Sequence, residues 1–201
     1  MALLPPGVCG KQAGGETVQA GEGAVMGEVI MGETMTPPER STQIAPGDPA
    51  PDSTLRGGGE TTVSLRDLRG RPVLLAFYSN DWSPVCGDEL SELAGRAEFD
   101  ERGVALLGIS VDGEWSHAAF AEARGISFPL LADFEPKGAV AYGVYRDRNG
   151  YSDRALVLID GDGDGVVRWT RMVDPWVNPG ADEALGAAGE LVAGGRTPGG
   201  V

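Results

Sequence analysis

The chain has 201 residues, 41% of them hydrophobic, which is enough for one domain of ordinary size with a real core. Its formal net charge of −14 would be repelled by nucleic acid and by anionic membranes, so we expect neither as a partner. Its two cysteines, Cys9 and Cys86, form no disulfide framework and no zinc ligand set, and we predict no metal or other cofactor.

The first residues, MALLPPGVCG, do not have the pattern of a targeting signal. No basic residue precedes their apolar run, and two prolines end it before it reaches the length of a signal peptide. No apolar run elsewhere approaches the ~20 residues of a membrane span. We therefore expect a cytoplasmic protein whose thiols are kept reduced.

Residues 1–43 are predicted to be a disordered arm, because Gly, Glu, Thr, Gln and Pro dominate them and aromatic residues are absent. The arm carries Cys9, which could reach Cys86 and form a recycling disulfide; an incidental thiol is the interpretation we favour. The folded domain is predicted to span 44–195, and residues 196–201 are predicted to be a flexible C-terminus.

Hydrophobic patterns and breaker residues define the elements of that domain. In chain order we predict an edge strand at 61–65, a core strand at 73–78, a helix from 86 to about 102, a core strand at 104–111, a helix at 114–124, an extended segment at 128–131, a small helix at 136–142, core strands at 155–159 and 166–172, and a final helix at 182–193.

This order of elements predicts an α/β protein. Two apolar strands joined by a helix should be parallel neighbours, and the last two strands, joined by a Gly/Asp turn, should be a hairpin. The result is a mixed central sheet flanked by helices. It is the layout of a thioredoxin-like fold with an N-terminal extension and a mid-chain insertion.

Cys86 stands where the first core strand gives way to a helix. Unpaired backbone N–H groups and the helix dipole at such a junction favour a negative charge. They can therefore lower the thiol pKa below the ordinary ~8.5, and the thiolate is the reactive form. We expect Cys86 to be a nucleophile, since the loop around it is polar and partly exposed; the alternative is a buried structural cysteine.

Several motifs around Cys86 occur together and in order. The segment from Ser79 to Cys86 matches a pattern of Pro, three residues, Thr, two residues and Cys, with Ser83 at the threonine position and Ser79 replacing the proline. A Cys-x-x-Glu continuation ends at Glu89, and Arg154 precedes the third core strand. On these motifs the chain resembles the peroxiredoxins, the alkyl hydroperoxide reductase and thiol-specific antioxidant family, and it is most similar to their one-cysteine AhpE-like bacterial branch.

The resemblance covers about residues 44–190 and implies a thiol-dependent peroxidase with the peroxiredoxin-type insertion. Cys86 would reduce hydrogen peroxide or an organic hydroperoxide and become a sulfenic acid. Ser116 stands where some similar proteins carry a second cysteine, so an external thiol or redoxin is the expected reductant. Family members often pair as homodimers. The family proline shields the thiol from water, so its replacement by Ser79 bears on turnover and peroxide selectivity.

The resemblance also implies roles for three residues near the thiol. Arg154 would stabilise the thiolate and the developing oxyanion; alternatively it is a surface arginine paired with Asp153. The Ser83 hydroxyl would bind sulfur and peroxide, and it would also suit a helix N-cap. Glu89 would orient Arg154, or it is a solvated carboxylate in the first helical turn.

The side chains that flank the motif are predicted to form a substrate pocket. Tyr78, Trp82, Pro84 and Val85 are the candidates, and plain packing is the alternative for the two aromatic residues. His117, the only histidine, has no Cys or His companion nearby in sequence, so we predict no metal-binding or catalytic role for it.

The Gly/Asp run at 160–165 is similar to a calcium-binding loop. Such a loop requires a glutamate at its twelfth position, where this chain has Arg171, so we interpret the run as a hairpin turn.

Two other functions remain as alternatives. A thioredoxin-like thiol–disulfide oxidoreductase would need Cys-x-x-Cys, and this chain has Glu89 at the second cysteine position. A peroxide sensor that reacts once without cycling is the other alternative, motivated by Ser79 and by the long arm.

Overall fold

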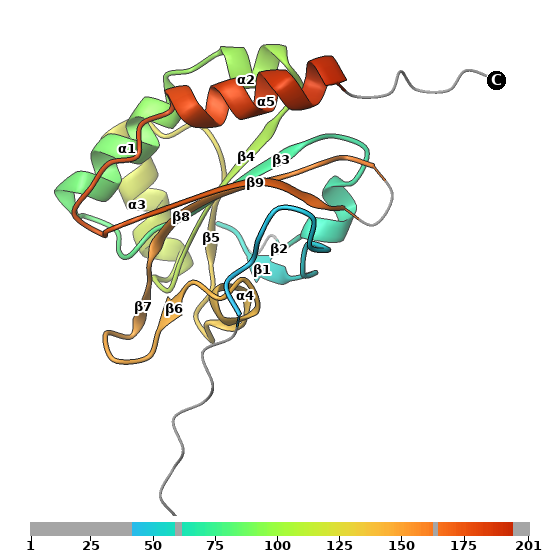
Figure 1. Ribbon diagram of the computed structural model, residues 1–201. Helices are drawn as coiled ribbons and strands as arrows, with labels where there is room; N and C mark the ends of the chain where they lie inside the picture. Colours follow the sequence, from blue (N-terminus) through green and yellow to red (C-terminus); the bar gives the residue numbers. More distant parts are fainter. Residues whose placement is uncertain (1–41, 59–61, 163–164, 195–201) are drawn as a thin grey trace, which may run out of the picture. The chain divides into compact units, whose positions relative to one another are not determined.

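The computed structural model describes residues 42–58, 62–162 and 165–194 (Figure 1). The predictions for the arm before residue 42, including Cys9, and for the C-terminus after residue 194 lie outside these residues. The strands are β1 (Thr54–Arg56), β2 (Thr62–Ser64), β3 (Val73–Phe77), β4 (Ala105–Ser110), β5 (Leu130–Ala132), β6 (Tyr145–Arg146), β7 (Tyr151–Ser152), β8 (Arg154–Ile159) and β9 (Val167–Val173). The helices are η1 (Leu65–Leu68, a 3-10 turn), α1 (Pro84–Ala94), α2 (Glu98–Glu101), α3 (Glu114–Arg124), α4 (Lys137–Ala141) and α5 (Asp182–Gly194).

The described strands form a seven-stranded mixed sheet in the order β2-β1-β5-β4-β3-β8-β9, and β6 and β7 form a separate pair. β3, β4 and β5 are parallel neighbours, as a strand–helix–strand connection requires. β8 runs antiparallel to β3 and forms a hairpin with β9. The predicted mixed sheet, its parallel centre and its late hairpin are therefore confirmed.

The centre of the sheet is covered on both faces, which explains why β3 is a continuous apolar run. Because side chains alternate along a strand, Leu75 and Phe77 enter one core cluster and Leu74 and Ala76 enter the other. Residues of α1, α2, α3 and α5 pack on the second face, whereas α4 packs on the first. Figure 1 shows α2 and α5 side by side on the far side of the sheet from α4.

The prediction of one helix from residue 86 to about 102 is wrong. The helix starts earlier, at Pro84, because proline at the first helical position has no N–H to leave unpaired and its φ already suits a helix. It also ends earlier, with Gly95 as its C-cap, and a separate short helix, α2, follows. Glycine is a poor helix former, so a break at this position is reasonable.

Three short strands and a 3-10 turn escaped prediction. β1 contributes only three residues, yet it pairs with β2 on one side and with β5 through Arg56 on the other. β6 and β7 contain two residues each. Such segments are too short for an alternating pattern to stand out, and only their partners make them strands.

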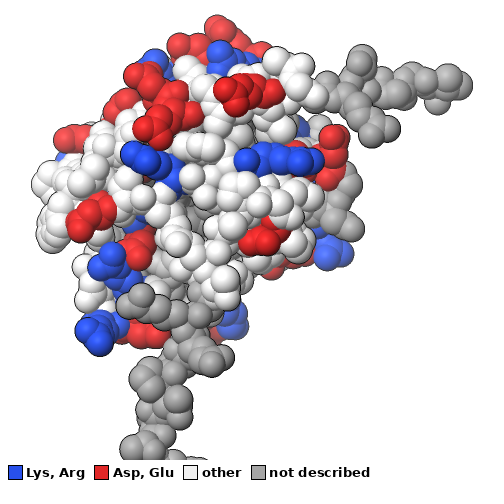
Figure 2. Space-filling view, in the orientation of Figure 1, with Lys and Arg blue, Asp and Glu red and all other residues white. Residues whose placement is uncertain are grey.

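The acidic composition is visible on the surface. Figure 2 shows acidic side chains grouped over the region where α2 and α5 lie in Figure 1. α2 contributes Glu98, Asp100 and Glu101, and α5 opens with Asp182 and Glu183. Within the described residues, no helix is both long and apolar enough to cross a membrane.

Candidate active site

Strand directions bring Cys86 and Arg154 to the same end of the sheet. Cys86 is the third residue of α1, shortly after β3 ends at Phe77. β8 runs opposite to β3, with Phe77 facing Ala155, so Arg154 at the start of β8 lies beyond the last residue of β3. Cys86 and Arg154, 68 positions apart in sequence, are therefore in direct contact.

The Cys86 sulfur is surrounded by polar groups although the residue is 0% exposed. Arg154 Nη2 lies 3.2 Å from Sγ, and Ser79 Oγ lies 3.4 Å from it. The Ser83 hydroxyl and the backbone N–H of Asn80 also lie close enough to the thiol to lower its pKa. The loop around Cys86 is partly exposed, as predicted, but the sulfur itself lies in the interior.

These contacts decide the ionisation of the thiol. Burial alone raises the pKa of Cys86, but hydrogen bonds from Ser79, Ser83 and the Asn80 N–H, together with the positive charge of Arg154, lower it below its ordinary value. From the sequence, we expected the helix N-terminus to lower the thiol pKa. In the structure, nearby side chains lower it directly.

Arg154 is held from several directions. Its side chain is 1% exposed and forms an ion pair with Glu89 through Nη1. Its Nη2 also donates to the Pro175 carbonyl at 2.8 Å, which fixes the plane of the guanidinium. The alternative of a surface arginine paired with Asp153 is wrong, since Asp153 pairs with Arg146.

Glu89 is buried beside Arg154, so it is not a solvated carboxylate of the first helical turn. Burial raises the pKa of Glu89 to about 7, while the charge and hydrogen bond of Arg154 act in the opposite direction. Its Oε1 is buried and has no hydrogen-bond partner within the described residues.

Ser83 precedes the first residue of α1, but its side chain makes no capping hydrogen bond to the helix backbone. The Ser83 hydroxyl instead acts on Cys86, whose thiol pKa it lowers. The structure therefore shows no side-chain cap, and a role of Ser83 toward sulfur and peroxide stays a prediction.

A buried polar cluster beside the thiol escaped sequence analysis. The Asp81 carboxylate accepts a hydrogen bond from the Tyr78 hydroxyl at 2.8 Å and lies 3.0 Å from His117 Nδ1. The Asp112 carboxylate accepts the backbone N–H of Asp81 at 2.8 Å. The cluster thus ties the loop before α1 to α3 and to the loop that precedes it. Its residues come from three separate segments of the chain, so no local sequence motif could predict the cluster.

The candidate pocket residues differ in their surroundings. Tyr78 is buried and its hydroxyl belongs to the Asp81 cluster. Trp82 is 54% exposed, stacks edge-on against Phe120, and has φ of 62°, which is unusual for a bulky residue. Pro84 is exposed and Val85 half-buried. That these four residues wall a substrate pocket stays a prediction.

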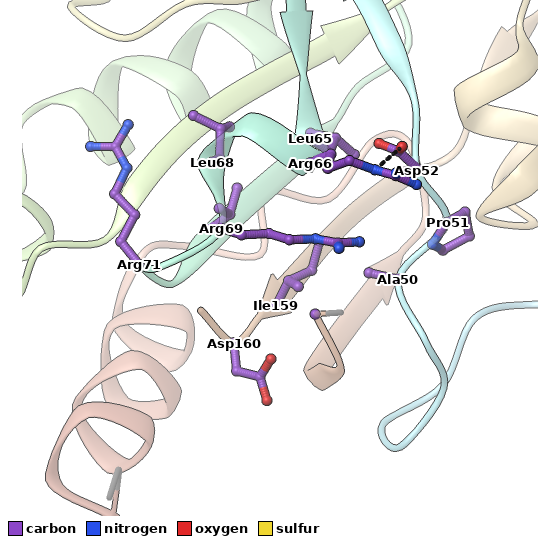
Figure 3. Close-up of a pocket in the computed structure, with 12 residues that line it drawn as sticks. Ala50, Pro51, Asp52, Leu65, Arg66, Leu68, Arg69, Arg71, Ile159 and Asp160 are labelled. Carbon is purple, nitrogen blue, oxygen red and sulfur yellow. Dashed lines mark hydrogen bonds and ion pairs between the residues drawn. The ribbon is translucent and has the colours of Figure 1, made fainter. Parts of the chain in front are cut away.

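A separate pocket lies at the opposite end of the sheet (Figure 3). Val73, the first residue of β3, and Ile159, the last of β8, help to line it, and Arg66 pairs with Asp52 beside it. It is remote from Cys86 along β3 and plays no part in the site. Among the residues with described positions, no group of His, Cys, Asp or Glu is arranged to hold a metal ion.

Comparison with known proteins gives this site its context. The model of the AhpC/TSA family matches residues 46–170, which is more than half of the 201 residues. The chain belongs to the AhpC/TSA family.

Individual relatives agree with this family assignment. Alkyl hydroperoxide reductase E of Mycobacterium tuberculosis (strain ATCC 25618 / H37Rv) is 38% identical over 133 residues, which cover 64% of this chain and 86% of the relative. Peroxiredoxin-2 of Pongo abelii is 35% identical over 150 residues, covering 69% of this chain and 84% of the relative. The crystal structure of peroxidoxin BcpB from Mycobacterium tuberculosis superposes with a TM-score of 0.67 at 29% identity, covering 74% of this chain and 99% of that one.

The predicted thioredoxin-like fold and the family resemblance are thereby confirmed. As a member of the AhpC/TSA family with peroxiredoxin relatives, the chain is a thiol-dependent peroxidase, an oxidoreductase that acts on peroxide. Neither the thiol–disulfide oxidoreductase nor the sensor alternative is favoured.

Proposed function

We propose that Cys86 is the peroxidatic nucleophile for hydrogen peroxide or an organic hydroperoxide. Its thiolate attacks the terminal peroxide oxygen, so that an S–O bond forms as the O–O bond breaks. The O–O electron pair leaves with the second oxygen, which takes the hydroperoxide proton and departs as water or an alcohol. Sulfur is oxidised by two electrons, and the sulfenate takes a proton from solvent to become a sulfenic acid.

Arg154 and Ser83 are proposed to assist this attack. The guanidinium, 3.2 Å from the sulfur, stabilises the thiolate and the negative charge that develops on the leaving oxygen. The Ser83 hydroxyl bonds to the sulfur and to the peroxide. Glu89, through its ion pair with Arg154, positions the guanidinium and does not meet the substrate.

An external thiol or redoxin is proposed to restore the enzyme. The first thiol attacks the sulfenic sulfur, forming a mixed disulfide and releasing water; a second thiol then displaces Cys86 and leaves with its partner as a disulfide. Ser116, where a resolving cysteine would stand, accepts a hydrogen bond from Trp82 Nε1 at 3.2 Å. Cys86 is 0% exposed, so the loop before α1 must open for this step.

The test is a stopped-flow measurement of hydrogen peroxide reduction. We expect Cys86→Ser to abolish the reaction and Cys9→Ser to retain it, and intact-mass analysis should find one added oxygen after sub-stoichiometric peroxide. A wild-type rate no faster than that of a free thiol, or activity retained in Cys86→Ser, would refute the proposal.

We also propose that a second copy of this chain docks at the active-site end of the sheet. Among the described residues, the exposed aromatic side chains are Trp82, Trp115, Phe134 and Trp176. The first three follow the carboxyl ends of the parallel strands β3, β4 and β5; Trp176 follows β9, whose last residue pairs with Arg154. All four therefore belong to one end of the sheet. Exposed apolar groups so gathered are typical of an interface.

Light scattering after size exclusion tests this association. The wild-type chain should elute with twice the monomer mass, and Trp115→Ser combined with Trp176→Ser should shift it to the monomer. Val192→Ser, an exposed apolar site on α5, is the matched control and should leave the mass unchanged. A wild-type monomer at micromolar concentration would disprove the dimer.

We place the enzyme in the cytoplasm, in keeping with its bacterial relatives and with the reduced thiol that the reaction needs. Fractionation of cells that express the full-length chain tests this placement, and recovery in the membrane or the extracellular fraction would contradict it.

A further inference from the structure

Ser79 stands next to the reacting atom. It follows Tyr78 at the end of β3, and its side chain is directed at the first turn of α1, with Oγ 3.4 Å from Cys86 Sγ. Ser79 is 9% exposed and Cys86 0%, so bulk water does not compete for this contact. A proline at this position, as in the family pattern, would offer no hydroxyl at all.

We infer that Ser79 is a catalytic residue whose hydroxyl donates a hydrogen bond to the Cys86 thiolate. A thiolate carries no proton, so in the reactive state the donor of the hydrogen bond between Ser79 and Cys86 must be the Ser79 hydroxyl. Together with Ser83, it gives the sulfur two hydroxyl donors from opposite ends of one short loop. This inference rests on the proposed role of Cys86 as the nucleophile.

The surrounding structure holds Ser79 in place. Two residues later, the Asp81 carboxylate is bound by Tyr78 and His117, and the Asp81 N–H donates to Asp112. The loop that carries Ser79 is thus fixed immediately after the serine, and its preceding residue Tyr78 is fully buried. A donor held in this way needs no reorganisation when the negative charge forms, which is the condition for electrostatic stabilisation.

Donation to the thiolate has opposite effects in two ranges of pH. Below the thiol pKa it increases the fraction of thiolate and therefore the rate. Above the pKa the thiol is ionised in any case, and a donated hydrogen bond makes the sulfur a weaker nucleophile, because nucleophilicity falls as the pKa falls. Damage to the fold would instead lower the rate at every pH.

The experiment measures the rate of Cys86 alkylation by iodoacetamide and its reaction with hydrogen peroxide across pH 4 to 10, in a Cys9→Ser background. We expect Ser79→Ala to raise the thiol pKa by about one unit and to slow both reactions about tenfold at low pH. At high pH the variant should equal or exceed the wild type. Ser79→Thr, which keeps the hydroxyl, should restore most of the pKa shift.

The control is Ser91→Ala, which removes a hydroxyl of α1 that bonds to the Arg124 carbonyl, away from the sulfur. It should leave the thiol pKa unchanged. An unchanged pKa in Ser79→Ala, or a rate lowered equally at all pH values, would overturn the inference. Cys86→Ser in the same peroxide assay separates the two claims: if it stays active, the proposed nucleophile is wrong; if it is inactive, only the role of Ser79 is at issue.

Discussion

At Cys86, burial and ionisation oppose each other, and the outcome depends on a few neighbouring groups. A buried thiol without partners would be neutral and inert. Here Arg154 and the hydroxyls of Ser79 and Ser83 reverse that tendency, so the pKa of Cys86 is lowered despite complete burial. Among these groups Arg154 alone carries a charge, and it cannot lose it by deprotonation.

Replacing Arg154 by Gln should therefore have a large effect on the reaction. We expect kcat/KM for hydrogen peroxide to fall by roughly 100-fold or more, since losing one preorganised donor at a developing negative charge costs about that much. The thiol pKa should rise as well. Arg146→Gln, an exposed arginine paired with Asp153, is the matched control and should retain activity. A loss of less than fivefold in Arg154→Gln would argue against the assigned role.

Among the elements, the loop between β3 and α1 carries both the Ser79 contact with the Cys86 sulfur and an unfavourable backbone conformation. Trp82 has φ of 62° in this loop, a conformation that costs a non-glycine residue roughly 1–2 kcal/mol. The hydrogen bonds of Asp81 to Tyr78 and His117 offset that cost by anchoring the loop. We expect these hydrogen bonds to oppose the loop opening that the proposed external thiol needs in order to reach the sulfur.

The hydrogen bonds that anchor this loop through Asp81 predict that the stability of the fold depends on pH. Burial raises the pKa of Asp81, but hydrogen bonds from His117, Ser116 and Tyr78 and the charge of His117 outweigh it and lower the pKa below its ordinary value. A carboxylate whose pKa is lower in the folded state stabilises the fold above its unfolded pKa, and this stabilisation is lost as the pH falls through the folded value. The wild-type free energy of unfolding should therefore decrease below about pH 4.

Asp81→Asn should remove that contribution. We expect it to lower the free energy of unfolding by about 1–3 kcal/mol at pH 7 and to flatten the pH dependence between 5 and 3 in urea titrations. Asp88→Asn, at an exposed position of α1, serves as the control and should behave like the wild type. The idea fails if Asp81→Asn keeps the full acid dependence.

For the molecule as a whole, the described contacts of the sulfur lie within the region that matches the family. Ser79, Ser83 and Arg154 fall between residues 46 and 170. We therefore expect residues 42–194 to carry the peroxidase reaction.

Deletion of residues 1–41 should leave kcat/KM for peroxide within twofold of the full-length value when an external thiol is supplied. The same deletion tests whether Cys9 resolves Cys86, because it removes that thiol. Full-length Cys9→Ser is the companion variant and should cycle equally well. If both variants react once and then stop although the external thiol is supplied, Cys9 is the resolving residue, and the external thiol reduces a Cys9–Cys86 disulfide instead of the sulfenic acid.

The amino-acid sequence by itself determined the class of protein and pointed to Cys86 as the candidate nucleophile. Continuous apolar runs predicted β3, β4 and β8, because strands buried on both faces contain few polar residues. Local motifs identified Cys86, Ser83 and Glu89, since these residues lie within two helical turns of each other. Arg154 followed from the family pattern, and its distance in sequence prevented any purely local argument.

Only the tertiary structure decided how the thiol is held. It showed that Ser79, noted in the sequence as a departure from the family pattern, touches the sulfur, and that Asp81, His117 and Tyr78 form one buried cluster. The physical reason is the same in each case. A side chain's pKa and its hydrogen bonds depend on groups within a few ångströms, and the fold assembles those groups from segments that the sequence separates.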